Sequence, residues 1–369
     1  MFQDLYKNYP WEKIEKKITP KTQVDLKKII LKDFFSPEDI ISLLSPAAEE
    51  FLELLAQKAA RITKDFFGKT IQLYTPMYLS NQCQNCCQYC GFNAQHQINR
   101  ITLDLKEIKK EADFIYKMGI RHLLLVSGED RKALPVKFLA QIATKIHKNF
   151  SSLGLEIYPL EIDEYKLLID SGVDALTIYQ ETYNPQTYAQ VHLAGPKKNF
   201  FYRLDVPDKG GQAGFRKIGI GALLGLADWR VEGFYLALHA LYLSKKYWQS
   251  QIQISFPRIQ ESWGGFQGLC PISDKALTHL IAVMRIINPT ANLIISTRES
   301  ETLRKNLLPI GITSMSAGSR TSPGAYTLNS KQNSQFNIQD NRSPKEVATF
   351  IKAQGYDPVW KDWDKNFLA

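Results

Sequence analysis

The sequence predicts an α/β protein built around a parallel (β/α)8 barrel of the TIM type. Short apolar runs alternate with stretches of helical periodicity along most of the chain, which is the pattern of parallel strands joined by helices. The length of 369 residues exceeds the roughly 250 residues of a simple barrel. We therefore expect an N-terminal helical extension over 1–70, the barrel over 71–327 and a C-terminal tail over 328–369. An open, doubly wound sheet is the alternative, because periodicity does not prove that the ring closes.

The chain before the barrel is predicted to be helical. Ser36-Pro37-Glu38-Asp39 combines a capping side chain, a proline at the first helical position and acids in the first turn. These features together mark the start of a helix. Residues 46–67 form a long amphipathic stretch that ends at Gly68.

Each apolar run of the central part is predicted as a strand. The runs cover residues 71–79, 122–126, 155–158, 175–179, 218–223, 251–256, 292–296 and 312–316. The clearest helical stretches between them are 103–118, 136–150, 162–170, 234–247, 274–287 and 299–307. The connection over 180–217 is longer and less regular. Beyond the barrel, 328–340 is polar and predicted to be irregular, and a last helix is expected near 344–354.

Four of the five cysteines lie in one short run after the first predicted strand. The spacing Cys83-x3-Cys87-x2-Cys90 can hold an iron–sulfur cluster through three thiolates. Four protein thiolates normally close such a cluster, so three leave one iron open to a substrate or cofactor. Cys86 is interpreted as a bystander, and Cys270 is assigned no role.

Zinc and disulfides are the competing explanations of the cysteine run. Zinc sites usually separate two CxxC pairs by a dozen residues or more, whereas Cys86 and Cys87 are adjacent. A zinc-binding structural or nucleic-acid-binding protein remains the remote alternative. The sequence shows no signal peptide and no long apolar span, so we expect a cytoplasmic protein with reduced thiols.

The charge balance favours no particular macromolecular partner. Lys and Arg number 46 and Asp and Glu 37, which gives a net charge of +9. This excess suits anionic ligands or simply solubility. The basic residues are spread out and no nucleic-acid-binding motif is present, so neither a nucleic acid nor a membrane is a predicted partner.

Polar side chains follow nearly every predicted strand. In a β/α barrel the C-terminal strand ends converge on one site, so these residues are expected to share a cavity. They are Ser127-Gly128-Glu129, Leu160-Glu161, Gln180-Glu181, Pro257-Arg258, Ser296-Thr297-Arg298 and Gly318-Ser319-Arg320.

The cysteine loop with Tyr89, placed after the first barrel strand, resembles that of the radical S-adenosylmethionine enzymes. Ser127-Gly128-Glu129 resembles the "GE" segment of that superfamily. Further blocks are similar to the tyrosine lyases of thiamine biosynthesis, the ThiH or 2-iminoacetate synthase family, and the resemblance runs from Trp11 to Asp364. The related tyrosine lyases of hydrogenase maturation carry additional C-terminal cysteines, whereas no cysteine follows Cys270 here. The blocks are Tyr179-Gln180-Glu181-Thr182-Tyr183, Ser255-Phe256-Pro257-Arg258, Ser296-Thr297-Arg298-Glu299 and Pro358-Val359-Trp360-Lys361-Asp362-Trp363-Asp364.

This resemblance implies a specific chemistry. Cys83, Cys87 and Cys90 would hold one [4Fe-4S] cluster, whose fourth iron binds S-adenosylmethionine. The radical made from this cofactor would take hydrogen from the amino group of L-tyrosine, and the products would be p-cresol and 2-iminoacetate. The implied partners are the thiazole synthase (ThiG) and an external electron donor such as flavodoxin or ferredoxin. Another radical enzyme of this barrel type, biotin-synthase-like or from the deazaflavin pathway, is the alternative. Cys86 departs from the family pattern.

The resemblance and side-chain chemistry together suggest roles for the strand-exit residues. Arg298 is expected to bind the tyrosine carboxylate, since a guanidinium matches a carboxylate bidentately; an ion pair with Glu299 is the structural alternative. Arg203 and Arg258 are cavity cations or structural salt bridges. Expected cofactor contacts are Tyr89, Gly91, Gly128, Glu129, Glu156, Glu161 and Glu181. Expected substrate contacts are Ser296, Arg298, Gln180 and Arg320.

Overall fold

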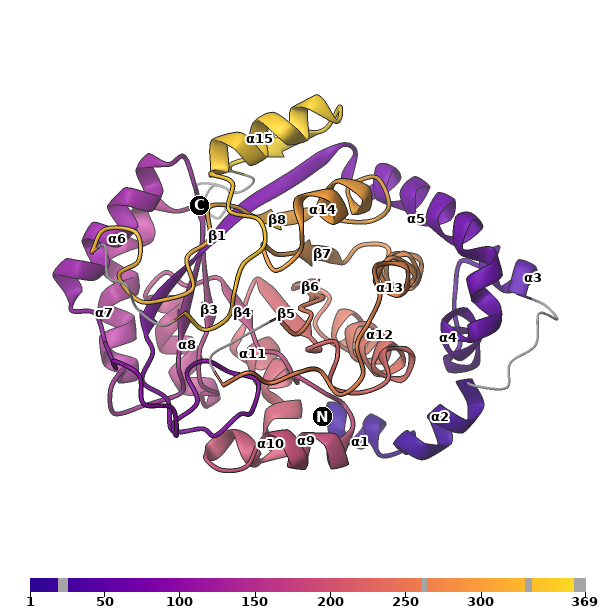
Figure 1. The fold of residues 1–369 in the computed structure, drawn as a ribbon, viewed down its shortest axis with the longest axis horizontal. Coiled ribbons are helices and arrows are strands. Elements are labelled where there is room, and N and C mark those ends of the chain that lie inside the picture. The colour runs from indigo at the N-terminus through magenta and orange to yellow at the C-terminus, as the bar shows by residue number, and fades with distance from the viewer. Residues whose placement is uncertain (19–25, 261–263, 329–333, 362–369) are drawn as a thin grey trace.

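A ring of eight parallel strands forms the centre of the molecule, and helices surround it (Figure 1). The computed structural model describes residues 1–18, 26–260, 264–328 and 334–361. The strands of the ring are β1 (Thr70–Ser80), β2 (His122–Ser127), β3 (Ser152–Glu156), β4 (Ala175–Thr177), β5 (Lys217–Gly221), β6 (Gln251–Ser255), β7 (Asn292–Ile295) and β8 (Ser314–Ser316).

Strand β1 closes the ring. Its residues Gln72 to Tyr74 pair with β8, and its residues from Thr75 onward pair with β2. The other strands pair in sequence order from β2 to β8. The predicted barrel is therefore confirmed, and the open doubly wound sheet is wrong.

Helices cover the outside of the ring. Between the strands lie α6 (Leu105–Lys117), α7 (Val136–Ile146), η2 (His147–Asn149), α8 (Ile162–Asp170), α9 (Pro185–Val191), η3 (Pro196–Lys198), α10 (Phe200–Leu204), α11 (Val206–Ala213), α12 (Trp229–Lys246), α13 (Asp274–Ile287) and α14 (Glu301–Leu307). Before the barrel lie α1 (Phe2–Tyr6), α2 (Trp11–Ile18), α3 (Leu26–Ile30), α4 (Pro37–Leu44), η1 (Pro46–Phe51) and α5 (Leu52–Phe67). After it come α15 (Pro344–Ala353) and β9 (Asp357–Val359).

Some boundaries differ from the predictions. Strand β3 begins at Ser152 and ends at Glu156, earlier than the predicted 155–158. The stretch 46–67 is helical, but its first six residues form a 3-10 helix. The irregular connection 180–217 contains short helices, which proline and glycine residues made hard to predict.

The N-terminal extension packs against the barrel helices. The backbone N–H of Phe2 donates to Asp208 of α11 at 2.9 Å, and the Tyr6 hydroxyl donates to the Tyr183 carbonyl at 2.8 Å. Figure 1 shows α1 beside α9 and α10, with α4 and α5 continuing around the ring. The buried apolar residues of the extension belong to the same core as those of the barrel helices.

The C-terminal segment returns to the first strand. The unpredicted strand β9 pairs with residues Thr70 to Gln72 of β1. The predicted helix near 344–354 is confirmed as α15. The ring of Trp360 lies against Gly119, whereas Trp363 lies outside the described residues. None of the helices in the described ranges has the length and apolar character needed to cross a membrane.

Candidate active site

The cysteine loop follows β1 and lies against the segment after α9. The backbone N–H of Cys86 donates to the Ala194 carbonyl at 3.0 Å, and the Leu193 N–H donates to the Cys86 carbonyl at 3.0 Å. An isolated antiparallel bridge joins Cys87 to His192. The cysteine loop is therefore held in place by a segment that lies about a hundred residues later in the chain.

Three of the four loop cysteines open onto one cavity of about 550 Å³, which we call the cysteine cavity. Cys83, Cys87 and Cys90 line it together with Gly128, Glu129 and Glu181. Cys86 is buried and is not among the residues that line this cavity.

The three thiols have to lose their protons before they can bind iron. Burial raises the pKa of Cys83 to about 11, and burial also raises the pKa of Cys87 and Cys90. Binding iron would therefore release protons from these groups. Among the described residues, no three Cys, His, Asp or Glu side chains are grouped closely enough to hold a metal ion.

Two glycines allow other parts of the backbone to approach the cysteine loop closely. A Cβ at Gly128 would lie 2.2 Å from the Gln82 carbonyl oxygen, so only glycine lets the end of β2 meet the cysteine loop. A Cβ at Gly91 would lie 2.5 Å from the Ser334 carbonyl oxygen. The Gly91 N–H donates to the Gln335 carbonyl at 3.0 Å, so the C-terminal tail covers the loop there.

A network of paired charges forms another wall of the cysteine cavity. Glu129 accepts from Arg203 at 2.8 Å and from the amide of Asn85 at 2.8 Å. Glu181 accepts from Lys197 at 2.6 Å, and Arg203 lies 3.7 Å from the same carboxylate. Because all four ionic groups are largely buried, the network fixes their positions.

Glu181 adopts an uncommon backbone conformation. Its φ of 70° is the one left-handed value at a non-glycine residue in the described ranges. Such a conformation costs about 1–3 kcal/mol and is concentrated at functional sites. The Leu223 N–H donates to the Glu181 carbonyl at 2.7 Å and holds it in place.

A further cavity of about 600 Å³, the barrel cavity, extends into the barrel interior. Polar side chains of β6 to β8 and their exits line one part, and aromatic rings of β1 line another. Phe336 and Gln335 from the tail also line it. Its lining includes Tyr74, Tyr78, Ser255, Ser296, Arg298 and Ser316.

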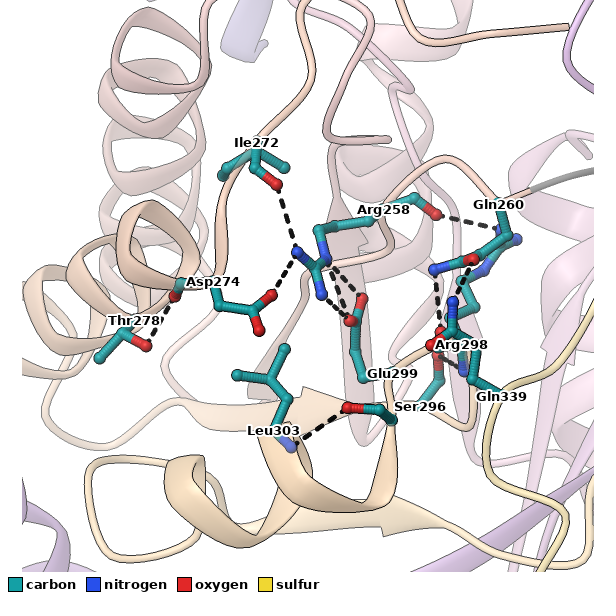
Figure 2. Close-up of polar contacts among 11 residues, drawn as sticks. Arg258, Gln260, Ile272, Asp274, Thr278, Ser296, Arg298, Glu299, Leu303 and Gln339 are labelled. Atoms are coloured by element: carbon teal, nitrogen blue, oxygen red, sulfur yellow. Dashed lines mark hydrogen bonds and ion pairs between the residues drawn. The ribbon is translucent and has the colours of Figure 1, made fainter.

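Arg298 faces the barrel cavity without an acidic partner among the described residues. Its guanidinium lies over the Phe336 ring, 3.3 Å from the centroid, and one nitrogen donates to the Arg258 carbonyl at 3.4 Å. Glu299 instead pairs with Arg258, as Figure 2 shows. The structural alternative for Arg298, an ion pair with Glu299, is therefore wrong, and Arg258 is a structural ion-pair residue.

Glu156, the last residue of β3, lies between the cysteine cavity and the barrel cavity and lines both. It lines the cysteine cavity, the barrel cavity and a third cavity between them, the bridging cavity, which Tyr89, Cys90 and Arg298 also line. Its carboxylate accepts no hydrogen bond from the described part of the chain. Burial, followed by the charge of Glu181, raises its pKa to about 7.

Several predicted site residues do not line these cavities. The Gln180 amide points toward α10 and donates to the Phe200 carbonyl at 3.4 Å. Glu161 begins α8 and pairs with Lys209 at 2.8 Å. Arg320 is exposed. The expectation that these three residues face the cavity was wrong.

Other cavity residues were not predicted. Lys197 and Asn85 join the charge network, and Gln335 and Phe336 come from the irregular tail. The Tyr89 hydroxyl bonds His192 at 2.7 Å. No periodic pattern identifies residues of this kind, since they lie in loops.

Comparisons with known proteins agree with this geometry. The radical SAM superfamily model matches residues 77–238, and the Biotin and Thiamin Synthesis associated domain matches residues 265–357. The 2-iminoacetate synthase of Salmonella typhimurium is 42% identical over 364 residues, which are 98% of this chain and 97% of that protein. The Escherichia coli enzyme has the same identity and coverage.

This chain belongs to the 2-iminoacetate synthase family.

The family assignment confirms the resemblance carried by the sequence motifs. Membership also makes the chain a radical SAM enzyme, and this superfamily uses a [4Fe-4S] cluster and S-adenosylmethionine. The structure of the hydrogenase maturase HydG from Carboxydothermus hydrogenoformans is also similar, with a TM-score of 0.90 and 32% identity over 98% of this chain and 85% of that one. The three converging cysteines fit the 2-iminoacetate synthase family.

Proposed function

We propose that this protein cleaves the Cα–Cβ bond of L-tyrosine to p-cresol and 2-iminoacetate, and that the imine serves thiazole formation in thiamine biosynthesis. Beyond the family assignment, one structural observation supports this proposal. The cavity lined by Cys83, Cys87 and Cys90 shares wall residues with a barrel cavity that Arg298 lines. Adjoining cavities of this kind suit a cofactor and an amino acid that react with each other.

Three thiolates would hold one [4Fe-4S] cluster. The network around Glu129 and Glu181 is suited to the charged groups of S-adenosylmethionine. Gly128 lines the same cavity, and Tyr89 lines the adjoining bridging cavity. Bound together, the cluster and S-adenosylmethionine supply a 5′-deoxyadenosyl radical that takes a hydrogen atom from the substrate.

The chain itself orients the substrate. Arg298 is suited to bind the tyrosine carboxylate through two parallel hydrogen bonds, with Ser296 beside it. The aromatic ring then extends among the apolar and aromatic side chains of the barrel cavity, including Leu124, Tyr74 and Ile294. Phe336 covers this region and limits the access of water.

The product chemistry implies further partners. An imine of this kind is unstable in water, so the thiazole synthase (ThiG) that consumes it is the expected protein partner. An external donor such as flavodoxin or ferredoxin supplies the electron. Acidic partners of this kind suit the net charge of +9, and the cytoplasm is the expected compartment.

Product analysis tests the proposed function. The protein is reconstituted with iron and sulfide under anaerobic conditions, reduced, and incubated with S-adenosylmethionine and one aromatic amino acid at a time. The expected result is p-cresol with L-tyrosine. Formation of 5′-deoxyadenosine without p-cresol would reject the tyrosine assignment and favour another radical enzyme of this barrel type.

A further inference from the structure

One carboxylate in the wall of the cysteine cavity, that of Glu156, lies outside the network of paired charges. Glu129 and Glu181 are both paired with cations. Glu156 is partly buried and lines all three cavities, and it has no ion pair among the described residues. A carboxylate in a cavity wall that has neither a cation nor a hydrogen-bond donor from the protein beside it can accept both from a bound ligand.

The location of Glu156 restricts which ligand group can reach it. Tyr179 and Gln335 also line all three cavities, but Glu156 is the charged member of this set. Arg298 shares the barrel and bridging cavities with Glu156. A cation site and an anion site therefore face the same space, which suits the two charged ends of an amino acid.

The proposed reaction requires a particular orientation of the substrate in these cavities. The hydrogen atom is taken from the substrate amino group, so that group has to face the cofactor. Glu156 lies between the cysteine cavity and the barrel cavity, where such an amino group would stand when Arg298 holds the carboxylate.

We propose that Glu156 binds the α-amino group of the amino-acid substrate, opposite Arg298, and thereby aims its N–H bonds at the cofactor. This inference rests on the proposed function and assigns Glu156 to the substrate rather than to the cofactor. The raised pKa of Glu156 is consistent with a carboxylate that gains its positive partner only when substrate binds.

Binding of substrate analogues tests the inference. Dissociation constants are measured by calorimetry on the reconstituted protein with S-adenosylmethionine and without reductant, so that nothing turns over. L-Tyrosine is compared with 3-(4-hydroxyphenyl)propanoate, which lacks the amino group, and with tyramine, which lacks the carboxylate. The wild-type protein should bind L-tyrosine more tightly than the propanoate by about tenfold to hundredfold, as expected for a charge-assisted hydrogen bond.

Matched variants distinguish binding of the substrate amino group from binding of its carboxylate. Glu156→Gln should weaken L-tyrosine and tyramine by about tenfold to hundredfold and leave the propanoate unchanged. Arg298→Gln should weaken L-tyrosine and the propanoate and leave tyramine unchanged. Glu53→Gln, in an exposed acid of α5, should change none of the three.

The contrary outcomes are distinct. Equal wild-type affinity for L-tyrosine and the propanoate overturns the inference without any variant. The inference is also overturned if Glu156→Gln weakens binding of S-adenosylmethionine but still prefers L-tyrosine to the propanoate. In that case Glu156 binds the cofactor. If the wild-type protein binds no L-tyrosine and forms no p-cresol, the proposed function falls and the inference with it.

Discussion

Arg258 holds the carboxylate of Glu299 in a buried ion pair between the exits of β6 and β7. The Arg258 Nε lies 3.0 Å from each Glu299 oxygen, and Glu299 is 1% exposed. Asp274 adds a further contact at 2.8 Å (Figure 2). This pairing satisfies Glu299 and leaves the neighbouring Arg298 available to the cavity.

Removing one member of this pair should destabilise the fold. Glu299→Gln is expected to lower the free energy of unfolding by about 3–5 kcal/mol, because it leaves the Arg258 charge without its buried partner. Denaturant or thermal unfolding measures the loss. Asp274→Asn is the control, since Asp274 is largely exposed and should cost less than about 1 kcal/mol; equal losses would contradict the account.

Arg298→Lys should impair tyrosine cleavage more than cofactor cleavage. A lysine keeps the charge but loses the planar fork that matches a carboxylate. The expected loss in kcat/KM for p-cresol formation is about 10- to 150-fold, corresponding to about 1.5–3 kcal/mol. The reaction is followed by chromatography of p-cresol and of 5′-deoxyadenosine made without substrate. A parallel fall of both products would argue against a carboxylate-binding role.

Cys86→Ser should keep the cluster, whereas the same change at Cys83, Cys87 or Cys90 should remove it. The reason is that Cys86 does not line the cysteine cavity and the other three do. Iron and sulfide per chain after anaerobic reconstitution provide the measurement. Loss of iron from Cys86→Ser at wild-type folding would show that this thiol is a ligand.

Gly91→Ala should displace the tail from the cysteine loop. The new Cβ would stand 2.5 and 2.7 Å from the carbonyl oxygens of Ser334 and Gln335, and these are backbone atoms. Gln335 would then lose its hydrogen bond from Tyr78, now 2.7 Å long. Limited proteolysis should cut the tail faster, and Tyr78→Phe, which removes that bond alone, should have a smaller effect. Unchanged proteolysis in Gly91→Ala would contradict the tail contact.

The buried Glu232 should make the fold less stable as pH rises. Burial raises its pKa from 4.5 to about 8, although Thr182 and the Tyr183 N–H donate to it. The folded state therefore holds a proton that the unfolded state loses between pH 4.5 and about 8, so stability falls through this window by up to about 1.4 kcal/mol per pH unit. Melting temperatures across this range should show a flatter profile for Glu232→Gln; identical profiles would refute the assignment.

The sequence predicted those parts of the fold and site that follow a regular residue spacing, and it failed to predict the parts that do not. Strand and helix alternation predicted the barrel, and cysteine spacing predicted the three residues of one cavity. Gln180 was misplaced because side chains alternate along an extended chain: Tyr179 and Glu181 line cavities, so the residue between them faces away.

The other errors have similar causes. Glu161 was expected at a strand exit because β3 was predicted to end later than Glu156, and it begins a helix instead. Lys197 and Gln335 lie in irregular segments, whose position in space depends on tertiary contacts that no local period encodes. The left-handed conformation of Glu181 is likewise a product of its surroundings.

One measurement tests the central claim most directly, which is that tyrosine lies with its amino group toward the cofactor and is cleaved there. The reconstituted protein is reduced in D2O with S-adenosylmethionine and L-tyrosine, whose amino hydrogens exchange with the solvent. Mass spectrometry then follows 5′-deoxyadenosine and p-cresol. The account predicts equal amounts of both products and one deuterium in each 5′-deoxyadenosine. Unlabelled 5′-deoxyadenosine, or 5′-deoxyadenosine without p-cresol, would contradict it.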